Sequence, residues 1–180
     1  MESFRDSVLN ESAPRRFGTI GEIIVENIKS REKIPLCEAE TIHYDRMSRD
    51  EGKIEIKFSR AKYPTNRITR ENLKSILVSP KFVEYNNKYN IHWDCNIQQV
   101  KPREFNVLYY GVMFVDKIVI FRIDNSTIEC DKNISYCNKQ HKGNTGEGQF
   151  HVKSSNFQYH YDNYLYKEFS WQELYDNYLE

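Results

Sequence analysis

Apolar residues recur with the period of a helix near the start of the chain. In the segment TIGEIIVENI, the isoleucines of positions 20–28 fall on one helical face. Thr19 and Glu22 have the spacing of a capping box, in which a hydroxyl and a glutamate satisfy main-chain groups at the start of a helix. The pattern therefore predicts a first helix from about Ile20 to Lys29.

Two segments that follow alternate between apolar and polar residues, as half-buried strands do. They cover residues 42–45 and 54–59, and the polar, glycine-containing SRDEG between them is typical of a hairpin turn. If the chain turns about Asp50, position 45 faces position 55 and position 43 faces position 57. One face of this predicted hairpin carries Ile42, Tyr44, Ile54, Ile56 and Phe58, and the other carries His43, Asp45, Glu55 and Lys57.

The rest of the pattern predicts further helices and strands. In chain order, we first expect a helix over residues 70–77, with Thr69 as its cap and a hydrophobic staple between Ile68 and Leu73. A strand over residues 95–100 and a helix from Pro102 to about Tyr109 should follow, and then two strands on either side of Asp116. A capping box of Ser170 and Glu173 should begin a closing helix. The segment QHKGNTGEGQFHV contains three glycines and is expected to form a loop. This order predicts a mixed α/β fold with one central sheet flanked by helices.

The length and composition of the chain favour one folded domain. A chain of 180 residues has the size of one well-cored domain, so we expect a single domain over residues 1–180. Its 39% hydrophobic and 14% aromatic residues can supply a core, which argues against disorder. The first 18 residues lack the apolar segment of a secretory signal, and the longest nearly apolar run, VLYYGVMFV, is too short to span a membrane. We therefore expect a cytoplasmic protein with no membrane partner.

The four cysteines indicate neither a disulfide framework nor a zinc site. They form no CxxC pair, and the chain has no secretory context, which favours reduced thiols. Cys130 and Cys137, taken with the histidines at 141 and 151, match none of the usual zinc-ligand spacings.

Charge is unevenly distributed along the chain, although the formal net charge is zero. Between Lys53 and Lys74, seven basic residues stand against two acidic ones. Charges farther apart than about 8–10 Å are screened in physiological salt, so this local excess matters more to a polyanion than the total does. Taken alone, the run is explained well by an ordinary solvated surface. With the neighbouring acids it becomes a candidate phosphate-binding segment, whose contact candidates are Lys53, Arg60, Lys62 and Arg67.

The polar face of the predicted hairpin brings two carboxylates and an ammonium together. Opposed residues have Cβ atoms about 4.5–5.5 Å apart, so Asp45 and Glu55 can share one cation and would repel each other without it. Mg²⁺ prefers oxygen ligands, and a main-chain carbonyl such as that of Ile56, water and a substrate phosphate would complete its coordination. On the same face, Lys57 can orient or help to deprotonate a water and offset charge on a phosphate. The arrangement favours Mg²⁺-dependent phosphodiester hydrolysis.

Asp45 followed ten residues later by Glu55-Ile56-Lys57 resembles the motif of the PD-(D/E)xK nucleases, whose core is a helix followed by a hairpin that carries these acids and the lysine. The segments TIGEIIVENI, KIEIKFSRA, NIQQVKPREFNVLYYGVMF and HKGNTGEGQF are similar to type II restriction endonucleases that cut GANTC-like or GAGTC-like sites, including small cleavage subunits of heterodimeric enzymes. The similarity covers roughly residues 17–170. Tyr44 stands where the motif has proline, but only the acid is required chemically.

The resemblance implies a restriction-endonuclease-like core, further site residues and partners. Many nucleases of this fold place a helix glutamate near the metal, which would be Glu22 or Glu26 in this chain. Gln99 and Lys101 would extend the site from the next strand. The resemblance also implies double-stranded DNA as substrate, Mg²⁺ as cofactor, and products with 5′-phosphate and 3′-hydroxyl ends. One such site cuts one strand, so a double-strand break would need a homodimer or a larger recognition or nicking subunit.

Several of these residues have a second interpretation. Asp50 or Glu51 could replace Asp45 as a ligand, although both fall in the predicted turn. Glu55 and Lys57 could form an ordinary ion pair on a solvated sheet, worth only ~0.2–1 kcal/mol.

Four other candidates are similarly open. The place of Glu22 in the predicted capping box already explains it as a capping acid. His43 would be a positioning group rather than a base, and His141 and Lys142 are candidates for contacts with DNA. Two rival functions stay in consideration: a junction-resolving or repair nuclease of the same fold, and a non-catalytic nucleic-acid-binding protein.

Overall fold

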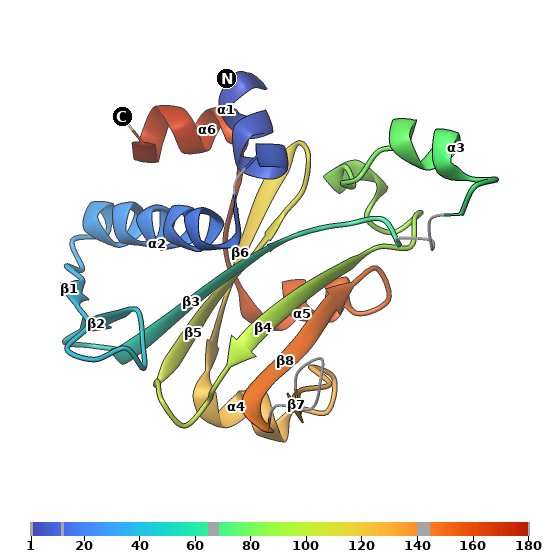
Figure 1. Cartoon of the computed structure of the whole chain (residues 1–180). Helices are drawn as coiled ribbons and strands as arrows, with labels where there is room; N and C mark the ends of the chain where they lie inside the picture. The colour runs from blue at the N-terminus through green and yellow to red at the C-terminus, as the bar shows by residue number, and fades with distance from the viewer. Residues whose placement is uncertain (1, 12, 65–68, 140–144, 180) are drawn as a thin grey trace.

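The computed structural model describes residues 2–11, 13–64, 69–139 and 145–179. The helices are α1 (Glu2–Asp6), α2 (Pro14–Arg31), α3 (Leu73–Val78), α4 (Asn125–Cys130), α5 (Phe157–Tyr164) and α6 (Trp171–Leu174), with the helical turns η1 (Ser7–Glu11), η2 (Tyr85–Asn87) and η3 (Tyr175–Leu179). The strands are β1 (Cys37–Glu38), β2 (Arg46–Ser48), β3 (Gly52–Arg60), β4 (Asp94–Val100), β5 (Val107–Met113), β6 (Lys117–Asp124), β7 (Cys137–Lys139), β8 (Thr145–Lys153) and β9 (Leu165–Ser170). The fold is α/β, with a mixed central sheet flanked by helices (Figure 1).

The larger sheet has the strand order β1-β2-β3-β5-β6-β9. β3 and β5 run parallel, with Ile54 opposite Val107 and Arg60 opposite Met113, and the other neighbouring strands run antiparallel. Every residue of β5 is buried, which explains its continuous apolar sequence VLYYGVM. A strand that is covered on both faces loses the alternation of polar and apolar residues.

The smaller sheet has the antiparallel order β4-β8-β7. Its strand β4 meets the end of β3 at a main-chain bridge. The Lys62 N–H donates to the Asp94 carbonyl at 2.9 Å, and the Asp94 N–H donates to the Lys62 carbonyl at 3.0 Å. From this bridge, β3 and β4 separate toward their other ends (Figure 1).

Two apolar cores lie on the two faces of the larger sheet. On one face, Ile24, Val25 and Ile28 of α2 pack with Ile54 and Ile56 of β3 and with the C-terminal helix. On the other face, β4, β8 and α5 pack against the sheet; the largest buried side chains there are Trp93, Tyr110, Phe114, Phe121, Phe150 and Phe157. Alternate residues of β3 therefore face different surroundings, as the predicted alternation requires.

The first helix begins earlier than the sequence pattern predicts. α2 starts at Pro14 after the N-cap residue Ala13, so Thr19 and Glu22 lie inside the helix and the predicted capping box is wrong. Proline suits the first helical position, where its missing N–H has no intrahelical partner. Because Glu22 caps nothing, its carboxylate is available for other contacts.

The segment predicted as a helix from Pro102 to Tyr109 is also wrong. It forms turns followed by β5. A short apolar run cannot be assigned to a buried helix or a buried strand by periodicity alone. Likewise, the segment predicted as a glycine-rich loop contains β8, and β8 pairs with β4 in a second sheet where the sequence predicted only one.

Other sequence predictions are confirmed in whole or in part. The strand predicted over residues 95–100 is β4, β5 and β6 lie on either side of Asp116, and Ser170 with Glu173 forms the predicted capping box of α6. The helix predicted over residues 70–77 is α3, but Asn72 rather than Thr69 precedes it. The predicted staple through Ile68 lies outside the described residues.

All four cysteines are free thiols, as the sequence predicted. Among the described residues, none of the helices combines the length and the hydropathy that a membrane crossing requires.

Candidate active site

The hairpin of β2 and β3 has the predicted register but a shorter first strand. Arg46 lies opposite Ile54, so a turn about Asp50 is confirmed. β2 begins only at Arg46, and the predicted strand over residues 42–45 is wrong. Asp45 nevertheless stays beside β3, because its N–H donates to the carbonyl of Ile54, the residue that Arg46 also faces, at 2.9 Å.

The residues before Asp45 leave the hairpin. Ile42 is 99% exposed, which contradicts its predicted place on the apolar face. His43 is exposed and lies 3.3 Å from a carboxylate oxygen of Glu104, rather than opposite Lys57 on a strand. Tyr44 is buried, but it packs in the core on the other side of the sheet from Ile54, Ile56 and Phe58, so its predicted place on their face is wrong.

The three predicted catalytic groups come together at the edge of β3. The Lys57 ammonium contacts the Glu55 carboxylate and lies 3.6 Å from Asp45 Oδ2. Asp45 Oδ2 also accepts a hydrogen bond from the Ile56 N–H at 2.7 Å. One cation therefore lies within reach of both carboxylates.

These groups line a cavity of about 190 Å³ between the two sheets. Gln99 and Lys101, at the end of β4, lie in its wall as the resemblance implied. Gln99 has a φ of 58° at an irregularity in the pairing of β4 with β8, which redirects the strand beside Lys57. The lining residues are Ile42, His43, Asp45, Glu55, Lys57, Gln99, Lys101, Glu104 and Glu147.

The residues present fit a divalent cation. The ammonium of Lys57 already occupies a position that contacts both carboxylates. The N–H and carbonyl of one strand residue point to the same edge, so the Ile56 carbonyl faces the edge on which Asp45 lies. Among the described residues, no three His, Cys, Asp or Glu side chains are grouped to hold a metal. A metal here would therefore draw on two carboxylates, a main-chain oxygen, and water or substrate.

Burial controls the charge of Glu55. Glu55 is only 8% exposed, and burial raises its pKa to about 7; the Asp45 charge acts in the same direction and Lys57 opposes it. Burial alone would lower the pKa of Lys57, but the charges of Glu55 and Asp45 outweigh it and raise that pKa. The site thus holds more negative charge than one ammonium satisfies.

The raised pKa of Glu55 predicts that stability depends on pH. Because the folded state holds the proton more tightly than the unfolded chain, the contribution of Glu55 is complete below its ordinary pKa of 4.5 and is lost as the pH rises through about 7. The loss should be on the order of 2 kcal/mol. Urea unfolding in EDTA, between about pH 5 and about pH 8, should show a smaller decrease for Glu55→Gln than for the wild type. Equal decreases in both proteins would contradict the assignment.

Glu22 and Glu26 of α2 approach the site through Arg46. The Arg46 guanidinium lies 3.1 Å from Glu22 Oε2, contacts the Glu26 carboxylate and donates to the Asp45 carbonyl at 2.6 Å. Burial raises the pKa of Glu22, and the Asp45 charge raises it further. Glu22 is therefore a helix glutamate whose pKa responds to the Asp45 charge. Arg46 connects α2 to the main chain of Asp45.

Removing the Arg46 guanidinium should destabilise the contact between α2 and the hairpin. Arg46→Gln leaves Glu22 and Glu26 without their shared cation, so we expect a loss of about 1–2 kcal/mol in the free energy of unfolding. In the double variant Arg46→Gln/Glu26→Gln, part of this loss should be recovered, because one of the two carboxylates is neutral. Chemical denaturation of the wild type, the two single variants and the double variant measures the coupling between Arg46 and Glu26. If the two changes in free energy simply add, the contact between these residues does not contribute to stability.

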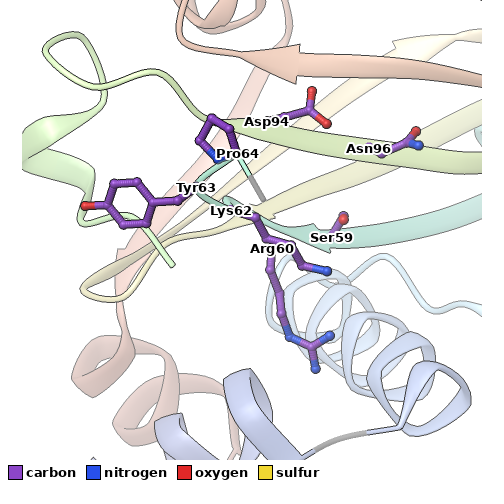
Figure 2. Close-up of a pocket in the computed structure, with 7 residues that line it drawn as sticks. All are labelled: Ser59, Arg60, Lys62, Tyr63, Pro64, Asp94 and Asn96. Carbon is purple, nitrogen blue, oxygen red and sulfur yellow. The ribbon is translucent and has the colours of Figure 1, made fainter. Parts of the chain in front are cut away.

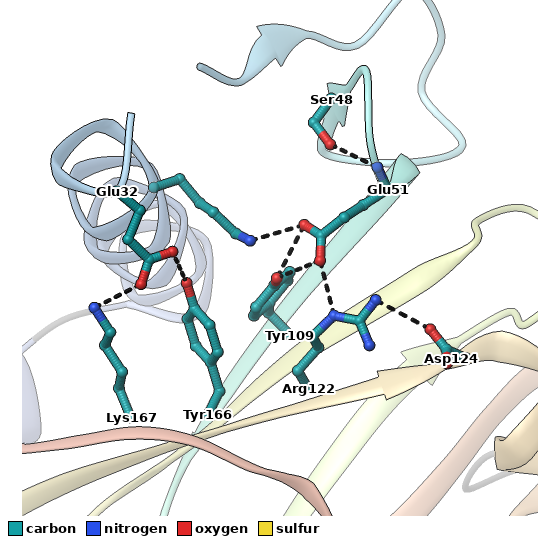
Figure 3. Close-up of polar contacts among 9 residues, drawn as sticks. Glu32, Ser48, Glu51, Tyr109, Arg122, Asp124, Tyr166 and Lys167 are labelled. Carbon is teal, nitrogen blue, oxygen red and sulfur yellow. Dashed lines mark hydrogen bonds and ion pairs between the residues drawn. The ribbon is translucent and has the colours of Figure 1, made fainter. Parts of the chain in front are cut away.

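Glu51, the alternative ligand in the turn, has other partners (Figure 3). Its carboxylate lies 2.9 Å from Lys29 Nζ and 2.8 Å from Arg122 Nε, and it accepts the Tyr109 hydroxyl at 2.8 Å. Burial would raise the pKa of Glu51, but the hydrogen bonds from Arg122, Lys29 and Tyr109 outweigh it and hold that pKa below its usual value. This network joins α2 to the hairpin turn, so Glu51 is held in a structural network rather than in the cavity. Asp50 is exposed in the turn.

The predicted DNA-contacting residues are dispersed. Lys53 is exposed and lies with its ammonium 5.5 Å from the Tyr44 ring centroid, outside the cavity. The Arg60 guanidinium turns toward the N-terminal helices, where it donates to the Val8 carbonyl at 2.8 Å and lies 3.8 Å from the centroid of the Phe17 ring. Lys62 is exposed beyond the end of β3. Three further candidates, Arg67, His141 and Lys142, lie outside the described residues.

Three charged residues at the site were not predicted from the sequence. Glu104 and Glu147 line the cavity, with carboxylate oxygens 3.7 Å and 3.9 Å from Lys101 Nζ. They come from segments predicted as a helix and a loop, so no pattern placed them near the hairpin. Arg46 follows Asp45 directly, but its contacts with α2 depend on how the helix packs on the sheet.

No family model matches the chain, and neither a curated protein nor a solved structure matches it significantly.

Proposed function

We propose that this protein is a Mg²⁺-dependent endonuclease that hydrolyses phosphodiester bonds in double-stranded DNA. The observation that supports the proposal is the Lys57 ammonium held between the carboxylates of Asp45 and Glu55 in one cavity. A solvated ion pair would need only one acid and no enclosure. Two acids, one of them buried, make a site that favours a further cation.

Each residue has a role in this proposal. Asp45, Glu55 and the Ile56 carbonyl would hold the metal, and Mg²⁺ would make a water more acidic and stabilise charge on the phosphate. Lys57 would orient that water and donate a hydrogen bond to the phosphate, because its charged ammonium lies beside both metal ligands. Glu22 would act from α2 through its proximity to Asp45.

The proposal extends to the biological class of the nuclease. The chain would be a type II restriction endonuclease or the cleavage subunit of one, and its products would carry 5′-phosphate and 3′-hydroxyl ends. Since one site cuts one strand, a second copy or a larger recognition or nicking subunit would cut the other.

Incubation with plasmid DNA and Mg²⁺, alone and with proteins encoded nearby, tests the proposed function. We expect nicked or linear DNA whose ends map to fixed positions, and no cleavage in EDTA. Cleavage confined to branched substrates in a parallel panel would instead identify a junction-resolving or repair nuclease. DNA left intact under all these conditions would overturn the proposal.

A further inference from the structure

A second cavity lies at the far end of β3, beside the bridge to β4. Its volume is about 270 Å³. Figure 2 shows its lining residues, which come from the end of β3, the segment that follows it and the start of β4: Ser59, Arg60, Lys62, Tyr63, Pro64, Asp94 and Asn96. No residue of this set lines the catalytic cavity.

The two cavities lie along one open strand edge. β5 pairs with β3 along most of its length, whereas β2 pairs only with the first three residues of β3. The Ile56 N–H points away from β5, since it donates to Asp45. Alternate residues of a strand direct their main-chain groups to the same edge, so those of Phe58 point there too. In the described part of the chain, no strand pairs with this edge between the hairpin and the bridge at Lys62.

The two cavities are far enough apart to contact different phosphates of one nucleic-acid strand. Glu55 of the catalytic cavity and Lys62 of the second one are seven residues apart along the chain. Seven strand residues span about 23 Å. A DNA strand places one phosphate per ~3.4 Å along the helix axis, so a phosphate at Lys62 would be several nucleotides from the one at the metal site.

The second cavity offers polar groups that the fold does not use. Lys62 is exposed, and within the described residues its ammonium makes no ion pair. The Asn96 amide donates to Gln149 Oε1 at 3.1 Å, while its Oδ1 is buried without a partner among the described residues. If the amides of Asn96 and Gln149 both rotate, Asn96 Nδ2 would donate to a phosphate oxygen and Asn96 Oδ1 would accept from the Gln149 amide. The carboxylate of Asp94 is hydrogen-bonded to His151 Nδ1 at 2.8 Å.

We propose that this cavity binds a DNA backbone phosphate several nucleotides from the scissile one, with Lys62 and Asn96 as its contacts. The proposal rests on the proposed function for its substrate, and it assigns the phosphate contact to Lys62 rather than to Arg60, whose guanidinium is turned toward the N-terminal helices. Main-chain groups on the open edge of β3 would lie between the two phosphates. Asp94 would repel the phosphate, and its pairing with His151 moderates that repulsion.

Binding of a short mixed-sequence DNA duplex to the full chain, in Ca²⁺ to prevent cleavage, tests this site. Lys62→Ala should weaken binding roughly 3- to 10-fold and lower the slope of log affinity against log salt by about one, because one phosphate contact is lost. Asp94→Asn should tighten binding, because it removes a negative charge at the same volume. Lys132→Ala is the matched control: Lys132 is exposed in the turn after α4, lines neither cavity, and should leave the slope unchanged.

A second measurement separates this proposal from the proposed function. In ¹⁵N-labelled protein, inorganic phosphate and the duplex should each shift the side-chain amide resonance of Asn96. If the protein cleaves DNA while the salt slope of Lys62→Ala equals that of the wild type, the phosphate site is wrong and the nuclease stands. If phosphate and duplex shift Asn96 but no DNA is ever cleaved, the anion site stands and the nuclease is wrong. If phosphate shifts only the resonances of surface lysines and not that of Asn96, it binds as an adventitious ion only, and the proposed phosphate site is wrong.

Discussion

Replacement of Asp45 by asparagine should abolish DNA cleavage while leaving the protein folded and able to bind DNA. Asparagine keeps an oxygen that can accept the Ile56 N–H, so the local main-chain geometry is preserved. It removes the negative charge that would hold the metal. A bound metal supplies several kcal/mol of transition-state stabilisation, which corresponds to a rate decrease of about a thousandfold or more. Single-turnover cleavage of a plasmid, with duplex binding measured in parallel, separates the two effects.

Asp50→Asn is the matched control for this variant. It makes the same chemical change five residues away, in the exposed turn of the same hairpin. If Asp45 holds the metal, Asp50→Asn should cut at nearly the wild-type rate. An equal decrease in both variants would mean that the charge of the hairpin as a whole matters rather than one ligand. Unchanged cleavage by Asp45→Asn would remove the basis of the proposed mechanism.

The short-range part of this site could be predicted from the sequence. The period-two alternation fixed which residues of β3 share a face, and the position of the turn fixed the register, so Asp45, Glu55 and Lys57 were brought together correctly. These inferences depend only on strand geometry and on turn residues that are close in sequence. The placement of Gln99 and Lys101 came instead from the resemblance.

The long-range part could not be predicted for physical reasons. Ile42 continues the alternation but is fully exposed, because β2 pairs with β3 over only three residues. β5 is buried on both faces and therefore carries no alternation to distinguish it from a helix. The start of α2 at Pro14 could not be predicted, because the pattern of isoleucines begins only at Ile20, after the helix has started. The role of Glu51 in a buried network depends on residues from α2, β5 and β6, and no local pattern reports such contacts.

Alanine at Gly111 should destabilise the protein strongly, because the ring of Phe58 covers this glycine. Gly111 lies opposite Phe58 in the parallel pairing of β3 and β5, and a Cβ added there would overlap the Phe58 ring. On its other side the ring already packs closely against Gly21 of α2, since a Cβ built on Gly21 would lie only 2.6 Å from Phe58 Cδ2. The ring therefore has little room to move away from Gly111. We expect a decrease of about 3 kcal/mol in the free energy of unfolding, at the upper end for overpacked cores. Since domains of this kind have only ~5–15 kcal/mol in total, the midpoint of urea unfolding should shift clearly.

Two further variants make this prediction specific. Phe58→Leu in the Gly111→Ala background removes the ring atoms that overlap, so it should recover part of the lost stability, although Phe58→Leu alone should destabilise. Gly18→Ala, on α2, is the control for a glycine with open space: a Cβ there meets nothing within 4 Å, and alanine should stabilise the helix by ~0.5–1 kcal/mol. Phe58 follows Lys57 in β3 and its ring packs against Gly21 of the helix that carries Glu22. DNA cleavage by the double variant should therefore also show whether this packing affects the site. If Gly111→Ala unfolds at the wild-type urea concentration, α2 is not held against the sheet through Phe58.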